Sequence, residues 1–235
     1  MNEKRIKLLK KGTNNPNARY VVYWMQQSQR IEYNHALSHA IMIANQNQLP
    51  LLVIFALTPN YPDANARHYT FMLEGIQSLL PQFAKKGISF VFKIGKIPDV
   101  IFPFLENTHT LIVDVGYLRH QREWRKDIMT YCEKMALPLT ITSVESDLIV
   151  PVSMASQKAE YGAYTLRSKL HQTYSEFRDH PILDELVNQS SIDIESDHDL
   201  MDISSLVKTL PINHLIVPSK YYHGGYDNAK KALIV

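Results

Sequence analysis

The sequence predicts a doubly wound α/β domain, with a five-stranded parallel sheet and helices on both faces. Apolar runs of strand length, rich in Val, Ile, Phe or Thr, recur along the chain, and several are continuously apolar, as in parallel strands covered on both faces. Helical patterns separate these runs, and the predicted strand order is 3-2-1-4-5 or close to it. The runs are residues 20–25, 49–57, 88–94, 110–115 and 137–144.

The first strand and the first helix are joined by a polar loop. YVVYWM, residues 20–25, ends in large side chains, and residues 26–30 are wholly polar. Asn34 is suited to cap the next helix, because its side chain can accept a hydrogen bond from a backbone N–H of the first turn. The apolar residues of that helix then recur at helical spacing: Leu37, Ala40, Ile41 and Ala44.

Three further helices are expected between the later strands. The first covers residues 67–86, where Pro81 predicts a kink or an earlier stop. A short helix over residues 98–105 opens on a proline, a residue favoured at the first helical position. The last covers residues 118–135, with apolar side chains at helical spacing.

The pattern divides the chain into three parts. Residues 1–150 are the α/β domain, and residues 151–223 form a linker wrapped on its surface, with one helix over about 158–178. Residues 224–235 begin a further helix that ends on apolar residues without a cap, which predicts a chain cut off inside its next structural unit. The basic N-terminus is expected to be a frayed, solvated end rather than a phosphate-binding arm.

Composition narrows the class of protein. No stretch approaches the roughly 18 apolar residues of a membrane span, and the N-terminus lacks the apolar core of a secretory signal. Cys132 is the only cysteine, so a protein of the reducing cytoplasm is expected. The net charge of +2 does not indicate a nucleic-acid binder, and a monomer is expected.

Several motifs that carry chemistry are absent from the sequence. It contains no GxxxxGK[ST] phosphate loop, no GxGxxG after the first strand and no GxSxG nucleophile elbow. The alternating acids of residues 193–199 resemble a calcium loop, but His198 stands where an EF-hand needs glycine. No catalytic residue and no metal ligand is therefore assigned.

Placement along the predicted sheet points to a binding site. Ligands of open α/β sheets lie at the carboxyl ends of the strands, near the point where the strand order reverses. Trp24 ends the first strand, and Asp114 and Tyr117 follow the fourth, so two flat rings and one charge suit a planar polar ligand. The alternative is structural: Trp24 packs in the sheet and Asp114 caps a helix.

Longer segments carry a family resemblance. YWMQQSQRIEYNHAL, LPLLVIFAL, ARHYTFMLEGI, GYLRHQREWR and VESDLIVPVSMASQKAEYGAYTLRSKLH occur in this order. Together they closely resemble the amino-terminal half of class II cyclobutane pyrimidine dimer photolyases, from about Tyr20 to the last residue. One departure is Tyr164, where the family pattern has arginine, which puts a local salt bridge or phosphate contact in doubt.

The resemblance implies a light-driven DNA repair enzyme. In that family FAD lies in a helical domain that splits dimers in UV-damaged DNA, and the α/β domain can hold an antenna pigment, a deazaflavin or a folate. Trp24, Asp114 and Tyr117 are then candidate pigment contacts, and residues 224–235 resemble the start of the flavin domain.

The resemblance also sets what this chain is expected to do. It is expected to be the antenna half, inactive alone, with the flavin domain supplied by a separate chain or lost. The alternatives are a stand-alone nucleotide- or pigment-binding α/β module and a non-functional remnant.

Overall fold

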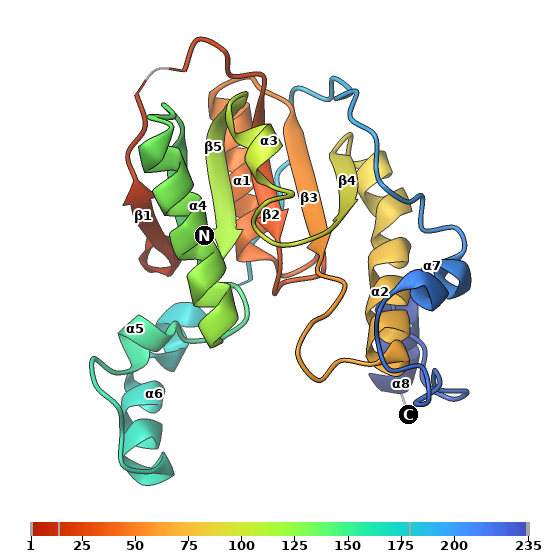
Figure 1. Cartoon of the computed structure of the whole chain (residues 1–235). Coiled ribbons are helices and arrows are strands. Elements are labelled where there is room, and N and C mark those ends of the chain that lie inside the picture. The colour runs from red at the N-terminus through yellow and green to blue at the C-terminus, as the bar shows by residue number, and fades with distance from the viewer. Residues whose placement is uncertain (1, 14, 179, 234–235) are drawn as a thin grey trace.

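The fold is a three-layer α/β sandwich around one mostly parallel sheet, as the computed structural model shows (Figure 1). The structure describes residues 2–13, 15–178 and 180–233. The sheet order is β1-β6-β5-β2-β3-β4, in which the predicted strands keep their predicted order. The strands are β1 (Ile6–Lys10), β2 (Tyr20–Met25), β3 (Leu51–Leu57), β4 (Ser89–Ile94), β5 (Thr108–Asp114) and β6 (Thr140–Val144).

The sheet has six strands among the described residues, where five were predicted. The additional strand is β1, which pairs antiparallel with β6, so the expectation of a frayed N-terminus was wrong. Its short IKLLK sequence is rich in lysine, a residue that protects exposed sheet edges, and the basic character concealed the strand. Gly12 allows close approach to β6, because a Cβ there would lie 2.4 Å from the Pro138 carbonyl oxygen.

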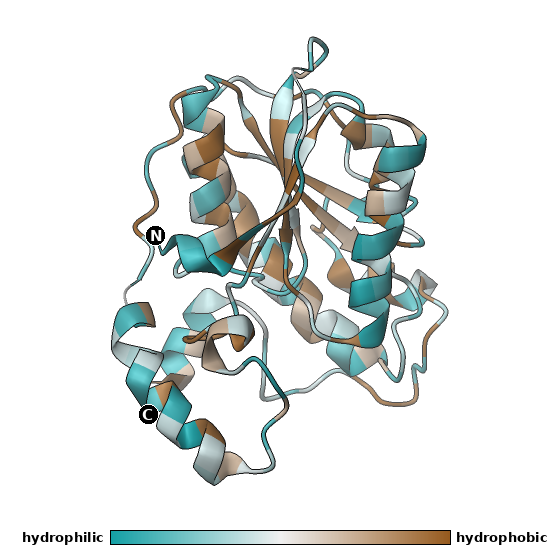
Figure 2. Ribbon diagram, turned by 90° about the vertical axis from the view of Figure 1, so that its left-hand side faces the viewer, coloured by the Kyte–Doolittle hydropathy of each residue, from teal (hydrophilic) through white to brown (hydrophobic). Residues whose placement is uncertain are grey.

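Helices cover both faces of the sheet. α1 (His35–Gln46) and α2 (Ala66–Lys85) pack on one face, whereas α3 (Phe102–Leu105) and α4 (Arg119–Lys134) pack on the other. β2 and β3 are buried along their whole length, which explains their continuously apolar sequences. Figure 2 shows the apolar residues gathered between the layers.

The predicted helices are present, with two differences in extent. α1 begins as expected, since the Asn34 side chain accepts from the Leu37 N–H at 2.9 Å. α2 continues through Pro81, although a kink or stop was predicted there. The expected 98–105 helix is reduced to α3, because residues 98–101 form turns.

The segment after β6 wraps around the domain. Its helices are α5 (Val152–Ala155), α6 (Ala163–Phe177) and α7 (Ile203–Thr209), and only α6 matches the one helix predicted there. Between α6 and α7 the chain runs along β4, where Asp197 accepts from the Ile94 N–H at 2.8 Å and pairs with Lys93. It therefore closes the second edge of the sheet.

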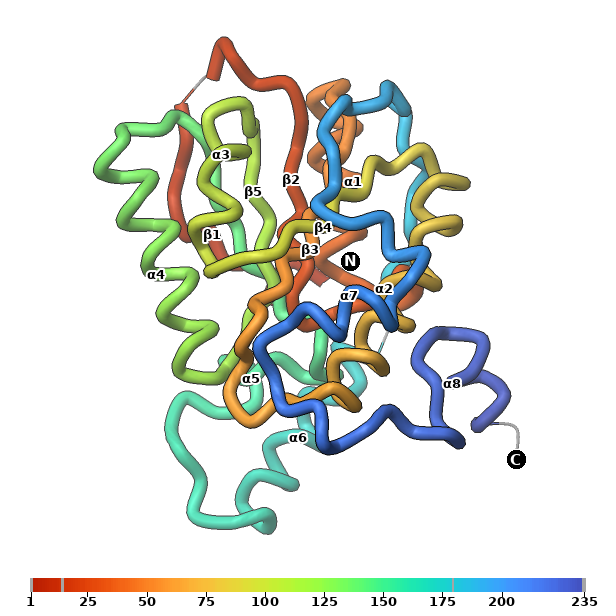
Figure 3. Tube along the Cα trace, turned by 45° about the vertical axis from the view of Figure 1, so that its right-hand side comes forward, coloured from red at the N-terminus to blue at the C-terminus, as the bar shows by residue number. Residues whose placement is uncertain are grey.

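The last helix, α8 (Tyr226–Leu233), follows a turn that lies against α2. Figures 1 and 3 both show α7 beside α2, and α6 beyond the carboxyl ends of the strands. Within the described residues, no helix combines the length and the apolar character needed to cross a membrane.

Candidate functional site

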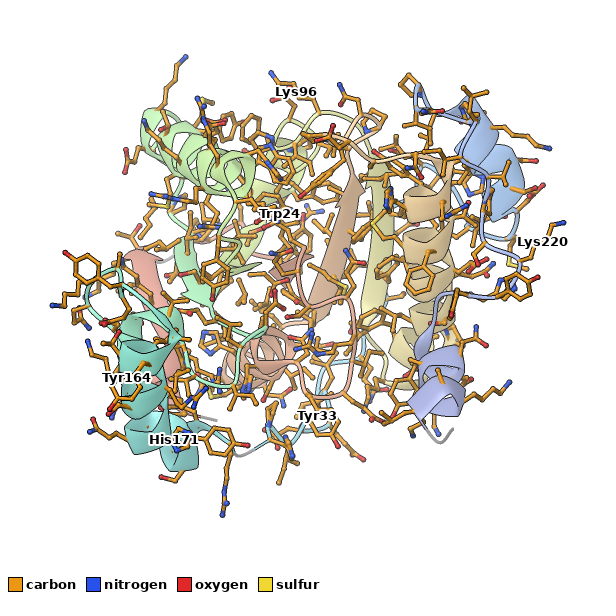
Figure 4. The ribbon with its side chains drawn as sticks, turned by 90° about the horizontal axis from the view of Figure 1, so that it is seen from below. Trp24, Tyr33, Lys96, Tyr164, His171 and Lys220 are labelled. Carbon is orange, nitrogen blue, oxygen red and sulfur yellow. The ribbon has the colours of Figure 1, made fainter. Side chains whose placement is uncertain are left out.

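A cavity of about 430 Å³ opens at the carboxyl edge of the sheet, which Figure 4 views from below. This volume falls in the range of small-molecule sites. It lies over the ends of β2 and β3, between α2 and α4, beside the boundary of β2 and β5 where the strand order reverses. The walls are largely apolar and aromatic, with four glutamines among the polar groups: Phe55, Ala56, Leu57, Tyr61, Tyr69, Met72, Ile97 and Trp124, with Gln26, Gln27, Gln29 and Gln121.

The polar loop after β2 forms one wall, and Asp114 holds it. Asp114 Oδ2 accepts hydrogen bonds from the backbone N–H groups of Gln26 and Gln27, both at 2.9 Å, and of Ser28 at 3.1 Å. Its other oxygen accepts from the Tyr23 hydroxyl at 3.0 Å. The loop thus folds around a buried carboxylate at the end of β5, which fixes the glutamines at the cavity.

The long loop after β3 forms a second wall. The Tyr69 hydroxyl donates to the Thr58 carbonyl at 2.6 Å and accepts from the Tyr61 N–H at 2.9 Å. At its far end Asn65 accepts from the first N–H groups of α2, at Arg67 and His68. Because both ends are fixed, the loop presents a preformed wall.

Aromatic side chains from this loop and α4 meet at the rim. Tyr61 Oη lies 2.8 Å from His120 Nε2, and the two rings are perpendicular, with centroids 4.8 Å apart. The His120 ring lies 4.9 Å from the Trp124 ring. Trp124, on the helix predicted over residues 118–135, is half-buried and lines the cavity.

The predicted site residues lie at the expected edge, but they do not line this cavity. Trp24 is fully buried and belongs to the apolar cluster that includes Ala56 and Ile97, so it lies beneath the cavity wall (Figure 4). Asp114 belongs to the opposite face, where it holds the loop. Their assignment as direct pigment contacts stays a prediction, and both make structural contacts here.

Tyr117 lies outside the cavity and is 39% exposed. Its hydroxyl donates to Glu145 Oε2 at 2.8 Å, and the same oxygen accepts from the Val152 N–H. Burial and the Glu145 carboxylate raise the pKa of Tyr117. Tyr117 therefore ties the β5–α4 loop to the start of the wrapped linker.

Burial sets the electrostatics below the cavity. It raises the pKa of Asp114, and the three backbone N–H donors act in the opposite direction by stabilising the carboxylate. Burial also raises the pKa of Tyr23, and the Asp114 charge adds to this effect. Among the described residues no lysine or arginine lines the cavity, and Asp63 is its one carboxylate.

Sequence analysis missed Tyr61, Gln121 and the cavity role of Trp124. The long loop after β3 was a usable signal for Tyr61, since long loops are often functional. No comparable feature of the sequence indicated Gln121. It is the third residue of α4 and accepts from the Leu118 N–H, as the Glu or Gln of a capping box does, but Leu118 stands where the sequence motif of a capping box has Ser or Thr.

Comparison with known proteins identifies the family. A sequence model of the DNA photolyase family matches residues 21–187, which is more than half of the chain. The chain belongs to the DNA photolyase family. Photolyase relatives include the deoxyribodipyrimidine photo-lyase of Methanothermobacter thermautotrophicus, 38% identical over 176 residues, and that of Potorous tridactylus, 34% identical over 182 residues.

Each alignment covers 75% of this chain, but only 38% and 33% of those photolyases. The chain thus spans less than half the length of these photolyase relatives.

Solved photolyase structures share the fold. An archaeal photolyase from Sulfolobus tokodaii, solved with two FAD molecules, has a TM-score of 0.67 at 15% identity, covering 91% of this chain and 45% of its own. A class III photolyase from Agrobacterium tumefaciens has a TM-score of 0.61 at 16% identity, covering 86% and 39%. At these identities the likeness shows the fold, and it confirms the α/β architecture predicted from sequence.

Proposed function

We propose that this chain is the antenna domain of a class II photolyase and holds a planar pigment in the cavity at the carboxyl edge of its sheet. The observation that carries the proposal is the cavity itself: about 430 Å³, preformed, and lined by aromatic and aliphatic side chains with a few amides. Such a lining suits a flat heteroaromatic ring, which buries apolar faces and offers polar edges.

The charge of the lining favours a deazaflavin over a folate. Folates carry anionic glutamate groups, and a buried anion needs a cationic partner. The described lining contains no lysine or arginine, and the Asp63 carboxylate would repel an anion. A deazaflavin with an uncharged side chain, such as 5-deazariboflavin, needs no such partner.

Repair of pyrimidine dimers in UV-damaged DNA is proposed for this domain together with a helical FAD-binding domain. The photolyase relatives are named for that activity, and the chain spans only part of their length. Deazaflavin would pass excitation to that FAD, whereas the residues of this chain would supply the pigment site. The proposal therefore assigns light collection to this domain and dimer splitting to the complex.

Titration of the purified protein with a deazaflavin, followed by pigment fluorescence, tests the antenna proposal. We expect saturable binding with deazaflavin preferred over folate. Ala56→Phe, which fills the cavity, should weaken binding at least tenfold, and Ala84→Phe, on an exposed surface of α2, should leave it unchanged. Equal binding by both variants would place the pigment elsewhere and refute the proposal.

A further inference from the structure

We propose that Gln121 selects the ligand of the cavity by donating a hydrogen bond from its side-chain nitrogen to a ring carbonyl of a neutral planar heterocycle. The inference rests on the proposed function, because it concerns the same cavity. It adds the chemical class of the ligand ring and names the side chain that recognises it. Gln121 is only 5% exposed and lines the cavity from the first turn of α4.

The orientation of the Gln121 amide is set by its neighbours. Its Oε1 accepts from the Leu118 N–H at 3.1 Å and from Gln27 Nε2 at 3.4 Å. Because only the amide oxygen can accept a hydrogen bond from a backbone N–H, the side-chain nitrogen must occupy the other position of the amide. Gly116 makes room for this arrangement, since a Cβ there would lie 2.4 Å from Oε1.

The Gln121 nitrogen is left with unused donors. Within the described part of the chain Gln121 Nε2 donates no hydrogen bond. A fully buried atom without a partner would be enclosed by protein, and Nε2 is not such an atom. It therefore faces accessible space, and the cavity is the space that Gln121 lines. A donor fixed at an otherwise largely apolar wall favours a ligand that brings an acceptor to that point.

The other lining residues favour a neutral acceptor over an anionic one. Asp63 disfavours an anionic ligand atom, and the described lining offers no lysine or arginine to balance it. Tyr61 and Trp124 supply aromatic surface at the same mouth. A carbonyl on the edge of a fused ring, as in the pyrimidinedione ring shared by flavins and deazaflavins, combines a neutral acceptor with flat apolar faces.

Gln121→Glu is the sharpest test, because it removes the donor but keeps an oxygen for the Leu118 N–H. The probes are 5-deazariboflavin, which has ring carbonyls, and phenazine, a flat ring without them. For deazariboflavin we expect the affinity to fall at least tenfold, since a carboxylate would face the carbonyl oxygen. Phenazine affinity should change less than about twofold, because phenazine has no ring carbonyl to accept this bond and its weakly basic nitrogens lie on the central ring.

Gln121→Met is the second variant, since it keeps the volume and adds no charge. It should weaken deazariboflavin binding by about two- to tenfold, the loss expected for one neutral hydrogen bond, again without affecting phenazine. Loss of both probes in either variant, with the thermal midpoint unchanged, would show a role in shape and overturn the inference. Unaltered deazariboflavin binding would also overturn it.

Different results would refute the proposed function and the role of Gln121. If the wild-type protein binds both rings and the variants do not discriminate between them, only the role of Gln121 is refuted. If the wild-type protein binds neither ring, the proposed function fails and the inference falls with it.

Discussion

Replacement of Asp114 by alanine should be among the most destabilising single changes in this domain. The carboxylate accepts from three backbone N–H groups of the loop after β2 and from the Tyr23 hydroxyl. Asp114→Ala leaves these four donors without their acceptor. At about 1–3 kcal/mol for each buried group, discounted because two of the N–H groups are only part-buried, we expect a loss of about 4 kcal/mol. This is a large fraction of the 5–15 kcal/mol typical of a domain.

Asp114→Asn separates charge from shape. Its amide oxygen can retain the loop N–H groups as neutral hydrogen bonds, so we expect a loss of about 1.5–3 kcal/mol. Asp99→Ala is the control, since Asp99 is exposed and lies 3.7 Å from the exposed Lys96. That change should stay within about 0.5 kcal/mol.

Urea unfolding monitored by circular dichroism measures all three variants. The urea midpoint should fall least for Asp99→Ala, more for Asp114→Asn and most for Asp114→Ala, with the slope of the transition unchanged. Asp114→Ala should also weaken pigment binding, because the glutamine wall loses its anchor. A loss below about 1 kcal/mol for Asp114→Ala would refute the reasoning that this carboxylate holds the loop.

Three other predictions concern different parts of the domain. Burial lowers the pKa of His39 to about 4, so between pH 6.5 and 4 the unfolded chain takes up a proton that the folded state does not. Stability should therefore fall as the pH drops through this window, and His39→Leu should flatten the fall by up to about 1.4 kcal/mol per pH unit in urea titrations; an unchanged slope would contradict this. Arg5 donates to the carbonyl oxygens of Leu148 and Phe177, among others, so Arg5→Ala should speed proteolysis between residues 145 and 180; an unaltered digestion pattern would argue against it. Trp124→Ala removes an aromatic wall of the cavity and should lower deazaflavin affinity about tenfold by fluorescence titration, whereas wild-type affinity would count against the site.

Sequence periodicity was sufficient for the architecture because the central strands are buried on both faces. β2 and β3 are apolar throughout, and their short length and their β-branched and aromatic residues favour a strand over a buried helix. β1 escaped prediction for the opposite reason. It is an edge strand with one face toward water, and its lysines look like a solvated terminus.

The position of the site could be predicted from the sequence, but the residues that line it could not. The carboxyl edge follows from the topology alone, whereas the facing direction of each side chain depends on strand register. Trp24 precedes the cavity-lining Gln26 by two residues and Asp114 precedes Gln121 by seven, yet strand register places these two side chains on opposite faces of the sheet. Gln121 depends on Gly116 and Leu118 folding around it, which a linear pattern does not reveal.

Chemical-shift mapping of the isotope-labelled protein with deazaflavin tests the central claim most directly. If the cavity is the pigment site, the backbone shifts should be confined to residues 26–29, 55–64, 68–72, Ile97 and the first turns of α4, with the Gln121 side-chain amide among the largest. Shifts centred on another surface, or none at saturating pigment, would contradict the assignment of this cavity as the antenna site.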